Sequence, residues 1–495
     1  MNPATNSAFP TFDFAALDAL GVNITRLTSD SRKLRQGDAF LAYPGESADG
    51  RRFIPAAIAA GSGAVLWERE EFEWDRDWNT PNLGVTGLRG KVGVIAERIY
   101  GNPSEKLWMI GVTGTNGKTS CAHWLAQALT ELGRKSALLG TLGNGFPGAL
   151  TPSPNTTPDP AELHQSLRAY LDAGAQCAAM EVSSHGLAQG RVNGVHFDVA
   201  LLTNLTRDHL DYHGDMASYA AAKAGLFGWP GLKYAVLNLD DPFGVELAAS
   251  LGCSGVQTVG YGFAGQRDNV HFVVLGRNLT VTAAGISFDA VTPWGSATLC
   301  SPLLGRFNAH NLLGVLATLL VSGVKLGDAI AALSAINAVP GRLQTLGGAN
   351  RPLVVVDYAH TPDALEKTLQ TLRETTNGRL ICVFGCGGGR DKGKRPQMGA
   401  IAARLADEAI VTSDNPRFEA PQLIIDEIVA AMTGHYHVVE DRALAIASAI
   451  RRAAPGDVVL VAGKGHEDYQ EINGERLPFS DAEVVARCLT EYPTC

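Results

Sequence analysis

Gly111-Val-Thr-Gly-Thr-Asn-Gly-Lys-Thr119 is the stretch around which the chain is organised. It follows the apolar run Leu107–Ile110, which predicts a buried strand, and it leads into residues 119–132, whose apolar positions recur at helical spacing. A glycine-rich turn between a strand and a helix lets backbone N–H groups crowd a polyphosphate. Lys118 would reach the terminal phosphates, and the Thr119 hydroxyl would hold Mg²⁺. The stretch therefore predicts nucleotide binding.

The glycines of this loop are spaced differently from those of the usual phosphate-binding pattern. That pattern has a glycine five residues before Gly117, where this chain has Val112. One alternative is a glycine-rich strand-to-helix turn with an incidental lysine. The flanking strand and helix favour nucleotide binding over that alternative.

The length and composition of the chain indicate a multidomain globular protein. Its 495 residues are too many for one core, so two to four domains are expected. Apolar residues make up 45% and charged residues 18%, and the formal net charge is −9, which provides no electrostatic footprint for nucleic acid or an anionic membrane. We recognise neither a targeting signal nor an apolar run of spanning length, so we expect a cytoplasmic protein without membrane insertion.

Residues 1–100 predict a small α/β domain, because short apolar strands alternate with Gly/Asp/Ser turns and single helices. Ser29, Ser31 and the turn at Gly45–Ser47 could contact a polar ligand through hydroxyl and backbone groups. Judged from the residues alone, solvated turns are the favoured interpretation.

In the middle of the chain, acidic and imidazole side chains follow predicted strands. Gln176–Val182 predicts a buried strand that ends in Glu181, where a carboxylate is placed to hold Mg²⁺ or to orient a nucleophile. The alternative is a carboxylate paired with Arg191. A strand at residues 197–203 opens onto Asn204–Gly214, whose histidines and aspartates could bind Mg²⁺ or phosphate.

Three further features of this region bear on the site. Gly214 argues against a helix over His209–His213, and the glutamate of a zinc-protease motif is missing, so a zinc site is not expected. Lys223 is the one cation of the helix predicted at 218–227, which on the residues alone makes it a solvated side chain. Thr151–Pro160 is too rich in proline for a regular element and is typical of a binding loop.

Residues 270–300 alternate with the period of strands, which predicts antiparallel strands beside the main sheet. Gly305–Ser322 predicts an apolar helix with Asn308 and Asn311 near its start. One asparagine there is readily an N-cap, and two beside an aromatic residue could also contact an adenine.

A boundary near Asn337–Arg342 precedes a second parallel α/β domain, in which predicted strands alternate with helices. Four loops follow strand ends, and in a doubly wound sheet they meet at the carboxyl edge, where ligands bind. A ligand site is therefore expected there, although Gly385–Gly389 lacks the spaced fingerprint of an NAD site. The loops are Asp357–Pro362, Gly385–Arg395, Ser413–Arg417 and Gly463–Asp468.

Taken in order, the motifs of this chain resemble those of the Mur ligase family along essentially its full length. The resemblance implies three α/β domains: an N-terminal UDP-substrate-binding domain at 1–100, a central P-loop ATPase domain at 101–336 with added antiparallel strands, and a C-terminal Rossmann-like domain at 337–495 that binds the amino acid. The motifs that carry it are GTNGKT at 114–119, NTTP at 155–158, MEVSSHGL at 180–187, TNLTRDHLDYHGDM at 203–216, YAAAK at 219–223, GRFNAHNLL at 305–313, PGRLQ at 340–344, DYAHTPDAL at 357–365, DNPR at 414–417 and GKGHEDY at 463–469.

The same resemblance implies roles for individual residues. ATP would be bound by Gly114, Thr115, Asn116, Gly117, Lys118, Thr119, Asn308, Arg342 and Asp357. The UDP-linked substrate would be bound by Ser29, Ser31, Gly45, Glu46, Ser47, Asn155, Thr156, Thr157, Ser183, Gln189 and Arg191. The incoming diamino acid would be bound by Arg390, Asp414, Asn415, Pro416, Arg417, Gly463 and Glu467.

By the same resemblance, Lys118, Glu181, His209 and Lys223 serve catalysis, and Mg²⁺ contacts Thr119, Glu181, His209 and Lys223. Lys223 matches a lysine that family members carbamylate, which reverses the interpretation from the residues alone. A carbamate turns a cation into an anion, and an anion suits Mg²⁺ better than it suits a solvated helix face.

The resemblance implies an ATP-dependent amide-bond ligase of peptidoglycan precursor synthesis, with ATP as co-substrate and Mg²⁺ as cofactor. ATP would phosphorylate the D-Glu carboxylate of UDP-N-acetylmuramoyl-L-alanyl-D-glutamate, and an amine would then attack the acyl phosphate. Arg417 is suited to clamp the far carboxylate of meso-diaminopimelate, and lysine-adding members lack this arginine. We expect small-molecule substrates and a monomer.

Alternatives to this function come from two classes. A lysine-adding sister ligase conflicts with Arg417, and a folylpolyglutamate-synthetase-like ligase is not expected to carry both Asn155–Thr157 and the DNPR motif. A nucleotide-binding protein without turnover would be expected to have lost one of the four catalytic positions named above. All four carry the expected residue.

Overall fold

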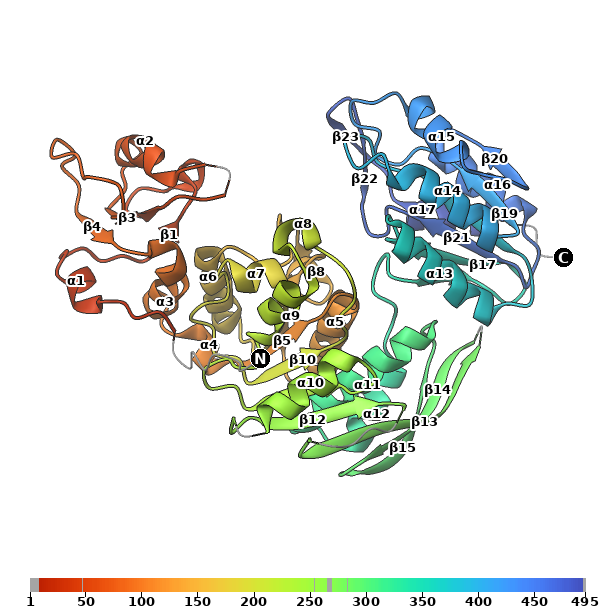
Figure 1. Cartoon of the computed structure of the whole chain (residues 1–495), viewed down its shortest axis with the longest axis horizontal. Coiled ribbons are helices and arrows are strands. Elements are labelled where there is room, and N and C mark those ends of the chain that lie inside the picture. The colour runs from red at the N-terminus through yellow and green to blue at the C-terminus, as the bar shows by residue number, and fades with distance from the viewer. Residues whose placement is uncertain (1–8, 47, 253, 265–268, 283, 493–495) are drawn as a thin grey trace. The chain divides into compact units, whose positions relative to one another are not determined.

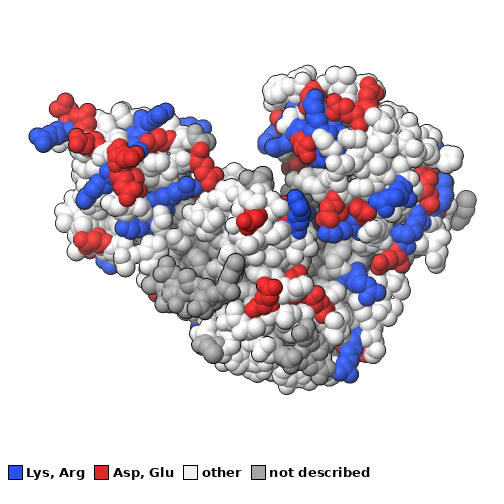
Figure 2. Space-filling view, viewed as in Figure 1, with Lys and Arg blue, Asp and Glu red and all other residues white. Residues whose placement is uncertain are grey.

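The structure of the chain is a computed structural model, which describes residues 9–46, 48–252, 254–264, 269–282 and 284–492 (Figure 1). Among the helices of these residues, none combines the length and the apolar character that a membrane span requires. On the face shown in Figure 2, basic and acidic side chains are interspersed. The chain divides into two compact units. Unit 1 comprises Met1–Arg277, Ala290–Ala297 and His310–Leu333, and unit 2 comprises Asn278–Asp289, Thr298–Ala309 and Ser334–Cys495.

The first part of unit 1 folds around a small sheet whose strands β1 to β4 pair in parallel and in chain order. Alternate residues of β2 and β3 enter two separate apolar clusters, so both faces of the sheet are covered. The small α/β fold predicted for this region is confirmed. Its elements are α1 (Phe14–Asp18), β1 (Leu27–Thr28), η1 (Ser31–Lys33), β2 (Ala39–Ala42), η2 (Gly50–Phe53), α2 (Ile54–Ala59), β3 (Ala64–Glu68), β4 (Asn82–Val85), α3 (Leu88–Ile99) and α4 (Pro103–Lys106).

The strand before the phosphate loop, β5 (Trp108–Thr113), lies between β9 (Cys177–Glu181) and β10 (Val199–Leu202) and pairs with both in parallel. Because later strands lie on both sides of β5, the strand order reverses there, and α/β sheets bind ligands at such a point. On one side the sheet continues in parallel with β11 (Tyr234–Asn238), β12 (Gln257–Gly262) and the start of β13 (Phe272–Thr282). On the other side follow parallel β6 (Ser136–Gly140) and antiparallel β7 (Gly143–Phe146) and β8 (Ala149–Thr151).

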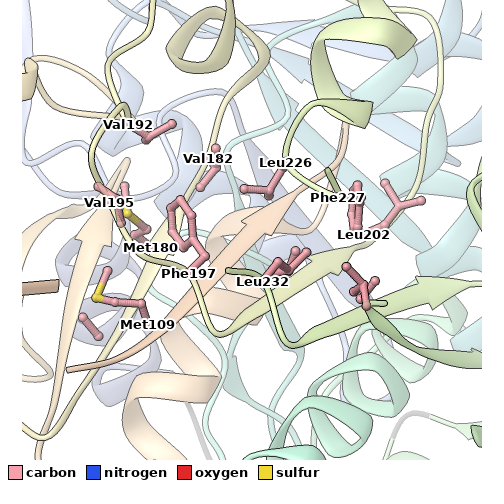
Figure 3. Close-up of a cluster of buried hydrophobic side chains, with 14 of the residues drawn as sticks. Met109, Met180, Val182, Val192, Val195, Phe197, Leu202, Leu226, Phe227 and Leu232 are labelled. Atoms are coloured by element: carbon pink, nitrogen blue, oxygen red, sulfur yellow. The ribbon is translucent and has the colours of Figure 1, made fainter. Parts of the chain in front are cut away.

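A large apolar cluster covers one face of this sheet (Figure 3). Met109 of β5, Met180 of β9 and Leu202 of β10 are fully buried in it, together with Phe197 and Phe227. Ala178 and Met180 belong to the cluster whereas the intervening residue does not, as the alternation of side chains along a strand requires. The helices of unit 1 are α5 (Lys118–Glu131), α6 (Pro160–Asp172), α7 (Ser184–Ala188), α8 (Leu210–His213), α9 (Met216–Ala224), α10 (Pro242–Leu251), α11 (Arg306–Val321, which starts in unit 2) and α12 (Leu326–Ser334).

Three local predictions are corrected. A one-turn helix, α8, forms after His209, and Gly214 with a φ of 80° ends it instead of preventing it. Asn308 and Asn311 are not N-caps, because α11 already begins at Arg306. The start of β13 pairs with β12 in parallel rather than antiparallel. The two strands after it, β14 (Gly285–Thr292) and β15 (Gly295–Ser301), are neighbours joined by two residues, a link too short for a parallel pair, so they run antiparallel.

Unit 2 contains a second sheet of order β16-β17-β21-β18-β19-β20, in which all neighbours are parallel except β16 and β17. Cys382 and Phe384 of β18 pack with α13, α14 and α15, whereas Ile381 and Val383 pack with α16 and α17. Helices therefore cover both faces, and the Rossmann-like prediction is confirmed. The elements are β16 (Gln344–Gly347), β17 (Leu353–Asp357), α13 (Pro362–Thr375), β18 (Leu380–Phe384), α14 (Lys394–Leu405), β19 (Glu408–Val411), α15 (Pro421–Val429), β20 (Tyr436–Val438), α16 (Arg442–Arg452), β21 (Val458–Ala462), β22 (Tyr469–Ile472), β23 (Glu475–Pro478) and α17 (Asp481–Thr490).

Candidate active site

The phosphate loop is a tight turn from β5 into the N-terminus of α5, which begins at Lys118. Gly114 has a φ of 145° and Gly117 a φ of 87°, conformations that favour glycine. A Cβ atom at Gly114 would lie 1.9 Å from Thr203 Oγ1, and one at Gly117 would lie 2.6 Å from Asn311 Oδ1. Backbone conformation and neighbouring atoms together therefore require both glycines. The turn leaves backbone N–H groups at a helix N-terminus, which is the arrangement that binds phosphate.

Residues that follow β10, and one residue of α9, hold this loop in place. Thr203 Oγ1 donates to Asn116 O at 2.6 Å, and Asn116 N donates to Asn204 Oδ1 at 2.9 Å. Thr115 Oγ1 lies 3.1 Å from the hydroxyl of Tyr219, with which it shares a hydrogen bond. The predicted ATP-binding stretch is thus organised by its neighbours without a ligand.

Two lysine side chains converge on one carbonyl group of the loop. Lys118 Nζ donates to Gly114 O at 2.9 Å and to Thr115 O at 2.8 Å, and Lys223 Nζ donates to the same Gly114 O at 2.8 Å. Lys223 is only 1% exposed, with its ammonium group 4.5 Å from the centre of the Tyr219 ring. Burial, and next the positive charge of Lys118, lowers the pKa of Lys223 to about 6. The interpretation of Lys223 as a solvated residue is wrong.

Glu181 is the last residue of β9, and its carboxylate lies beside the phosphate loop. The residue is buried, with 1% of its surface exposed. Oε2 accepts from Thr119 Oγ1 at 3.0 Å and from Thr141 Oγ1 at 3.2 Å, and Oε1 accepts from Thr141 N at 2.7 Å. Gly140 makes room for it, because a Cβ atom there would lie 2.2 Å from Glu181 Oε1. Glu181 does not pair with Arg191, so that alternative is wrong. Nothing in the sequence singled out Gly140 or Thr141.

His209 lies at the start of α8 in a left-handed conformation with a φ of 52°. Its Nε2 atom is 3.3 Å from Asp208 Oδ2, and its ring contacts those of His185 and Tyr219, whose centres are 4.8 Å and 6.2 Å away. Tyr219 also contacts Lys223, so one ring lies near both His209 and that lysine. The metal role predicted for His209 stays a prediction.

Five of the residues predicted to bind the UDP-linked substrate are connected by hydrogen bonds in unit 1. Thr157 Oγ1 lies 3.0 Å from Ser183 Oγ, and Arg191 donates to Thr157 O at 2.9 Å and to Gln189 Oε1 at 2.7 Å. Gln189 Nε2 in turn donates to Glu46 Oε1 at 2.6 Å. The remaining residues of the set lie as follows: Thr156 Oγ1 is 3.1 Å from Thr141 Oγ1, Asn155 is exposed, Ser31 opens η1, Gly45 donates to Ala48 O, and Ser47 lies outside the described residues.

Asp159 adds two contacts that the sequence did not reveal. Its Oδ2 atom accepts from Ser29 Oγ at 3.5 Å and from Tyr43 OH at 3.4 Å, and Oδ1 accepts from Ala161 N at the start of α6. Burial raises the pKa of Asp159 above its ordinary value. An aspartate before a proline is a readable helix start, but its partners 116 to 130 residues away are not readable from spacing.

The nucleotide residues predicted in unit 2 surround the end of β17. Asp357 accepts from Leu343 N at 2.8 Å and from Ala359 N at 2.9 Å, and its burial raises its pKa. The Arg342 guanidinium stacks 4.9 Å from the centre of the Tyr358 ring, and its Nε atom is buried without a hydrogen-bond partner among the residues the structure describes. Asn308 Nδ2 donates to Leu304 O at 2.8 Å. Contact of these residues with a nucleotide stays a prediction.

The loops after β18, β19 and β21 meet at the carboxyl edge of the unit 2 sheet. Arg417 Nη1 donates to Gly388 O at 2.7 Å, and its Nε atom lies 3.2 Å from Glu471 Oε2. A Cβ atom on Gly387 would lie 3.0 Å from Arg417 Nη1 and 3.9 Å from Cγ of Arg390, which is exposed. Two arginines predicted to bind the amino acid therefore flank one glycine.

The other residues predicted to bind the amino acid lie in the same loops. Asn415 Nδ2 donates to Glu467 Oε2 at 2.8 Å. Gly463 has a φ of 119°, and a Cβ atom there would lie 2.6 Å from Asp414 Oδ2. Pro416 completes the turn, and its carbonyl oxygen would lie 2.0 Å from a Cβ atom on Gly388. The structure thus brings this set together. It also adds two residues that the sequence did not single out, Lys464 and Glu471.

Three segments of the chain match known domain families. Residues 23–97 match the Mur ligase family catalytic domain, residues 112–319 the Mur ligase middle domain, and residues 341–465 the Mur ligase glutamate ligase domain. Together they cover most of the chain.

Two full-length relatives carry the same name. The chain is 53% identical over 490 residues to the UDP-N-acetylmuramoyl-L-alanyl-D-glutamate–2,6-diaminopimelate ligase of Chromobacterium violaceum, with 98% of each chain covered. It is 51% identical over 471 residues to the ligase of that name from Pseudomonas aeruginosa, with 95% of this chain and 96% of the relative covered. A solved structure described by the same name is 38% identical, with a TM-score of 0.71 over 94% of this chain and 95% of the other. The MurF ligase of Thermotoga maritima in complex with ADP is 20% identical with a TM-score of 0.64, covering 96% of this chain and 99% of its own, which shows a shared fold.

Gly117→Ala should weaken ATP binding at least about tenfold, because the added Cβ atom would collide with the Asn311 amide inside the loop. Gly133→Ala is a matched control, since Gly133 has a φ of 81° and open space around it. The two variants share the backbone strain, but only Gly117→Ala adds a collision. Calorimetric titration with a non-hydrolysable ATP analogue measures both variants. Equal losses of affinity would contradict the crowding argument.

Proposed function

The chain belongs to the Mur ligase family, and on that premise we propose that it adds meso-diaminopimelate to the D-glutamate of UDP-N-acetylmuramoyl-L-alanyl-D-glutamate at the expense of ATP. The observation that carries this proposal is the full-length identity of 53% to a ligase that is named for this reaction. The reaction is a step of peptidoglycan precursor synthesis. We further propose that the protein acts in the cytoplasm, because ATP and UDP-linked substrates are cytoplasmic metabolites; the monomer expected from the sequence stays a prediction.

The reaction needs ATP because a carboxylate and an amine do not condense unaided in water. The γ-phosphoryl group passes to an oxygen of the D-Glu carboxylate, which gives an acyl phosphate and ADP. The amine nitrogen then forms a bond to the acyl carbon, the bond from that carbon to the phosphate oxygen breaks, and the nitrogen loses a proton. No covalent enzyme intermediate is required, so positioning and charge neutralisation are the main contributions of the protein.

Within this scheme the chain's own residues bind and neutralise the polyphosphate. Lys118, which donates to two carbonyls of its loop, would turn to the γ-phosphate when ATP is bound. The N–H groups at the start of α5 would cradle the neighbouring phosphates. Thr119 and Glu181 offer a hydroxyl and a carboxylate oxygen 3.0 Å apart, and such hard oxygen ligands fit Mg²⁺. That ion, with His209 as a further contact, would offset phosphate charge.

Lys223 fits the carbamate that the family resemblance implies. A neutral amine is needed to attack CO₂, and a pKa near 6 leaves the buried amine mostly neutral at pH 7. The nitrogen would form a bond to the CO₂ carbon and lose a proton, so the side chain would become an anion beside Lys118. An anion there would suit a second Mg²⁺ and would remove the repulsion between the two lysines.

Arg417 would select the amino acid. Meso-diaminopimelate resembles lysine with an additional carboxylate at its far end, and a guanidinium group can bind a carboxylate with two parallel hydrogen bonds. The guanidinium is directed by Gly388 O and Glu471, so little rotamer freedom would be lost when the substrate binds.

The decisive assay is ATP-dependent phosphate release with UDP-N-acetylmuramoyl-L-alanyl-D-glutamate, with meso-diaminopimelate and L-lysine offered in separate reactions. We expect turnover with meso-diaminopimelate alone. Turnover with lysine would support the ligase activity but contradict the proposed specificity. No phosphate release with either amino acid would overturn the proposed function.

Carbamylation of Lys223 should depend on pH. Above a pH of about 6 the amine is neutral and reacts with CO₂, and as the pH falls below that value protonation should suppress the reaction. A ¹³C NMR titration with ¹³C-bicarbonate measures the carbamate signal, which Lys223→Ala should lack. The same variant should lose most turnover, with partial rescue by a short carboxylic acid. Full activity of Lys223→Ala would contradict the carbamate.

Arg417→Ala should raise the KM for meso-diaminopimelate about 10- to 100-fold and leave the KM for ATP almost unchanged, because one charge-assisted contact is lost. Arg417→Lys is the matched control that keeps the charge without the bidentate geometry. Its KM for meso-diaminopimelate should lie between those of the unmodified protein and Arg417→Ala. Steady-state kinetics with each substrate varied in turn gives both constants. Similar increases in the two KM values would rule out the selective role.

A further inference from the structure

Unit 2 contains a fully buried lysine, Lys464, in the loop after β21. Lys464 is 0% exposed, and its Nζ atom donates to Asn415 Oδ1 at 3.0 Å and to Glu467 Oε2 at 3.1 Å. Burying an ammonium group is costly unless it is paired and hydrogen-bonded. Both of its partners belong to the set predicted to bind the incoming amino acid. The contacts of Lys464 are therefore made to that site and not to the apolar core.

Lys464 determines which way the side-chain amide of Asn415 faces. An ammonium group can only donate, so the atom that faces it must be the amide oxygen. The same oxygen accepts from Glu471 N at 2.9 Å, a second donor of fixed identity. The NH₂ group of Asn415 is consequently directed to Glu467 Oε2, to which it donates at 2.8 Å.

Glu467 receives two of these donors on one carboxylate oxygen. Oε2 accepts from both Asn415 and Lys464, whereas Oε1 has no hydrogen bond to any residue in the described part of the chain. The Glu467 side chain keeps 20% of its accessible surface. One oxygen is thus held by the protein and the other is left for a donor from outside, such as the ammonium group of an amino acid.

The same network reaches the arginine that would bind the far carboxylate. Glu471, whose N–H group donates to Asn415, places its carboxylate 3.2 Å from Arg417 Nε. Its carbonyl oxygen accepts from Arg417 N at 2.9 Å. Asn415 therefore connects an acceptor for an ammonium group, Glu467, with a donor for a carboxylate, Arg417.

We propose that Lys464 is a positioning residue for the amino-acid substrate, which orients Asn415 and Glu467 so that Glu467 Oε1 binds an ammonium group of the substrate at a set distance from Arg417. This inference rests on the proposed function, because it takes a diamino acid as the ligand. Lys464 does not touch the substrate, and its effect passes through Glu467. Binding of the amino acid should therefore depend on Lys464, whereas binding of ATP should not.

Lys464→Met removes the charge and keeps the length of the side chain. Without the ammonium group, the Asn415 amide is held more weakly, because its oxygen keeps only the bond from Glu471 N, and Glu467 Oε2 loses one of its two donors. The KM for meso-diaminopimelate should rise about tenfold or more, while the KM for ATP and the kcat at saturation should change less than about twofold. Arg379→Met is the control, because Arg379 pairs with Asp457 at the opposite edge of the same sheet. It should leave both KM values unchanged.

A double-mutant cycle shows whether Lys464 acts through Glu467. Lys464→Met combined with Glu467→Gln should raise the KM for meso-diaminopimelate no further than Glu467→Gln alone, because both changes remove the same contact. Increases that multiply, or equal increases in both KM values after Lys464→Met, would overturn the inference. If Lys464→Met does not fold, Lys464→Gln, which keeps a donor, supports the same cycle. Absence of turnover by the unmodified protein would instead overturn the proposed function, and the inference with it.

Discussion

Lys118 and Lys223 donate hydrogen bonds to a single oxygen, the carbonyl of Gly114. Two cations cannot approach one acceptor cheaply in a buried site, so one of them must give up its proton or gain a partner of opposite charge. Lys223 is the more deeply buried of the two, and its burial, together with the charge of Lys118, lowers its pKa. The loop conformation depends on the same residue, Gly114. Its φ of 145° favours glycine, and Thr203 occupies the place that a Cβ atom would take.

Two lysines are buried among the residues that the structure describes, and they are in opposite electrostatic surroundings. Lys223 faces Lys118 and a carbonyl oxygen, a setting that favours a neutral amine. Lys464 faces the carboxylate of Glu467, which compensates an ammonium charge. The same residue type is thus suited to the proposed carbamylation in unit 1 and to holding other side chains in unit 2. Burial alone does not distinguish these roles, whereas the charge of the nearest partner does.

Much of the fold follows from the sequence, because apolar runs with glycine and aspartate punctuation identified the strands that carry the site. β5 and β9 have bounds within three residues of the predicted strands, and β18 and β21 end directly before the predicted loops at Gly385 and Gly463. The predictions failed where tertiary packing decides the outcome. Lys223 looks exposed on an alanine-rich helix, yet Tyr219, one turn earlier on the same face, is buried with it. Thr141, Asp159 and Lys464 were missed because their partners are brought close by the sheet and not by the chain. The family resemblance, unlike the residues alone, gave Lys223 a role at the phosphate loop, and the carbamate it implies stays a prediction.

Arg417 adopts a left-handed conformation with a φ of 52°, which costs a residue other than glycine or asparagine about 1 kcal/mol or more. The loop therefore retains an arginine at a position where asparagine or glycine would be more comfortable. Laboratory evolution that rewards heat resistance alone would favour those two residues at 417 and would discard the guanidinium. If Arg417 selects the amino acid as proposed, a thermostabilised descendant of this protein would then discriminate poorly among amino acids while still consuming ATP, since the phosphate loop belongs to the other unit. Selectivity and robustness are in competition at this one backbone position.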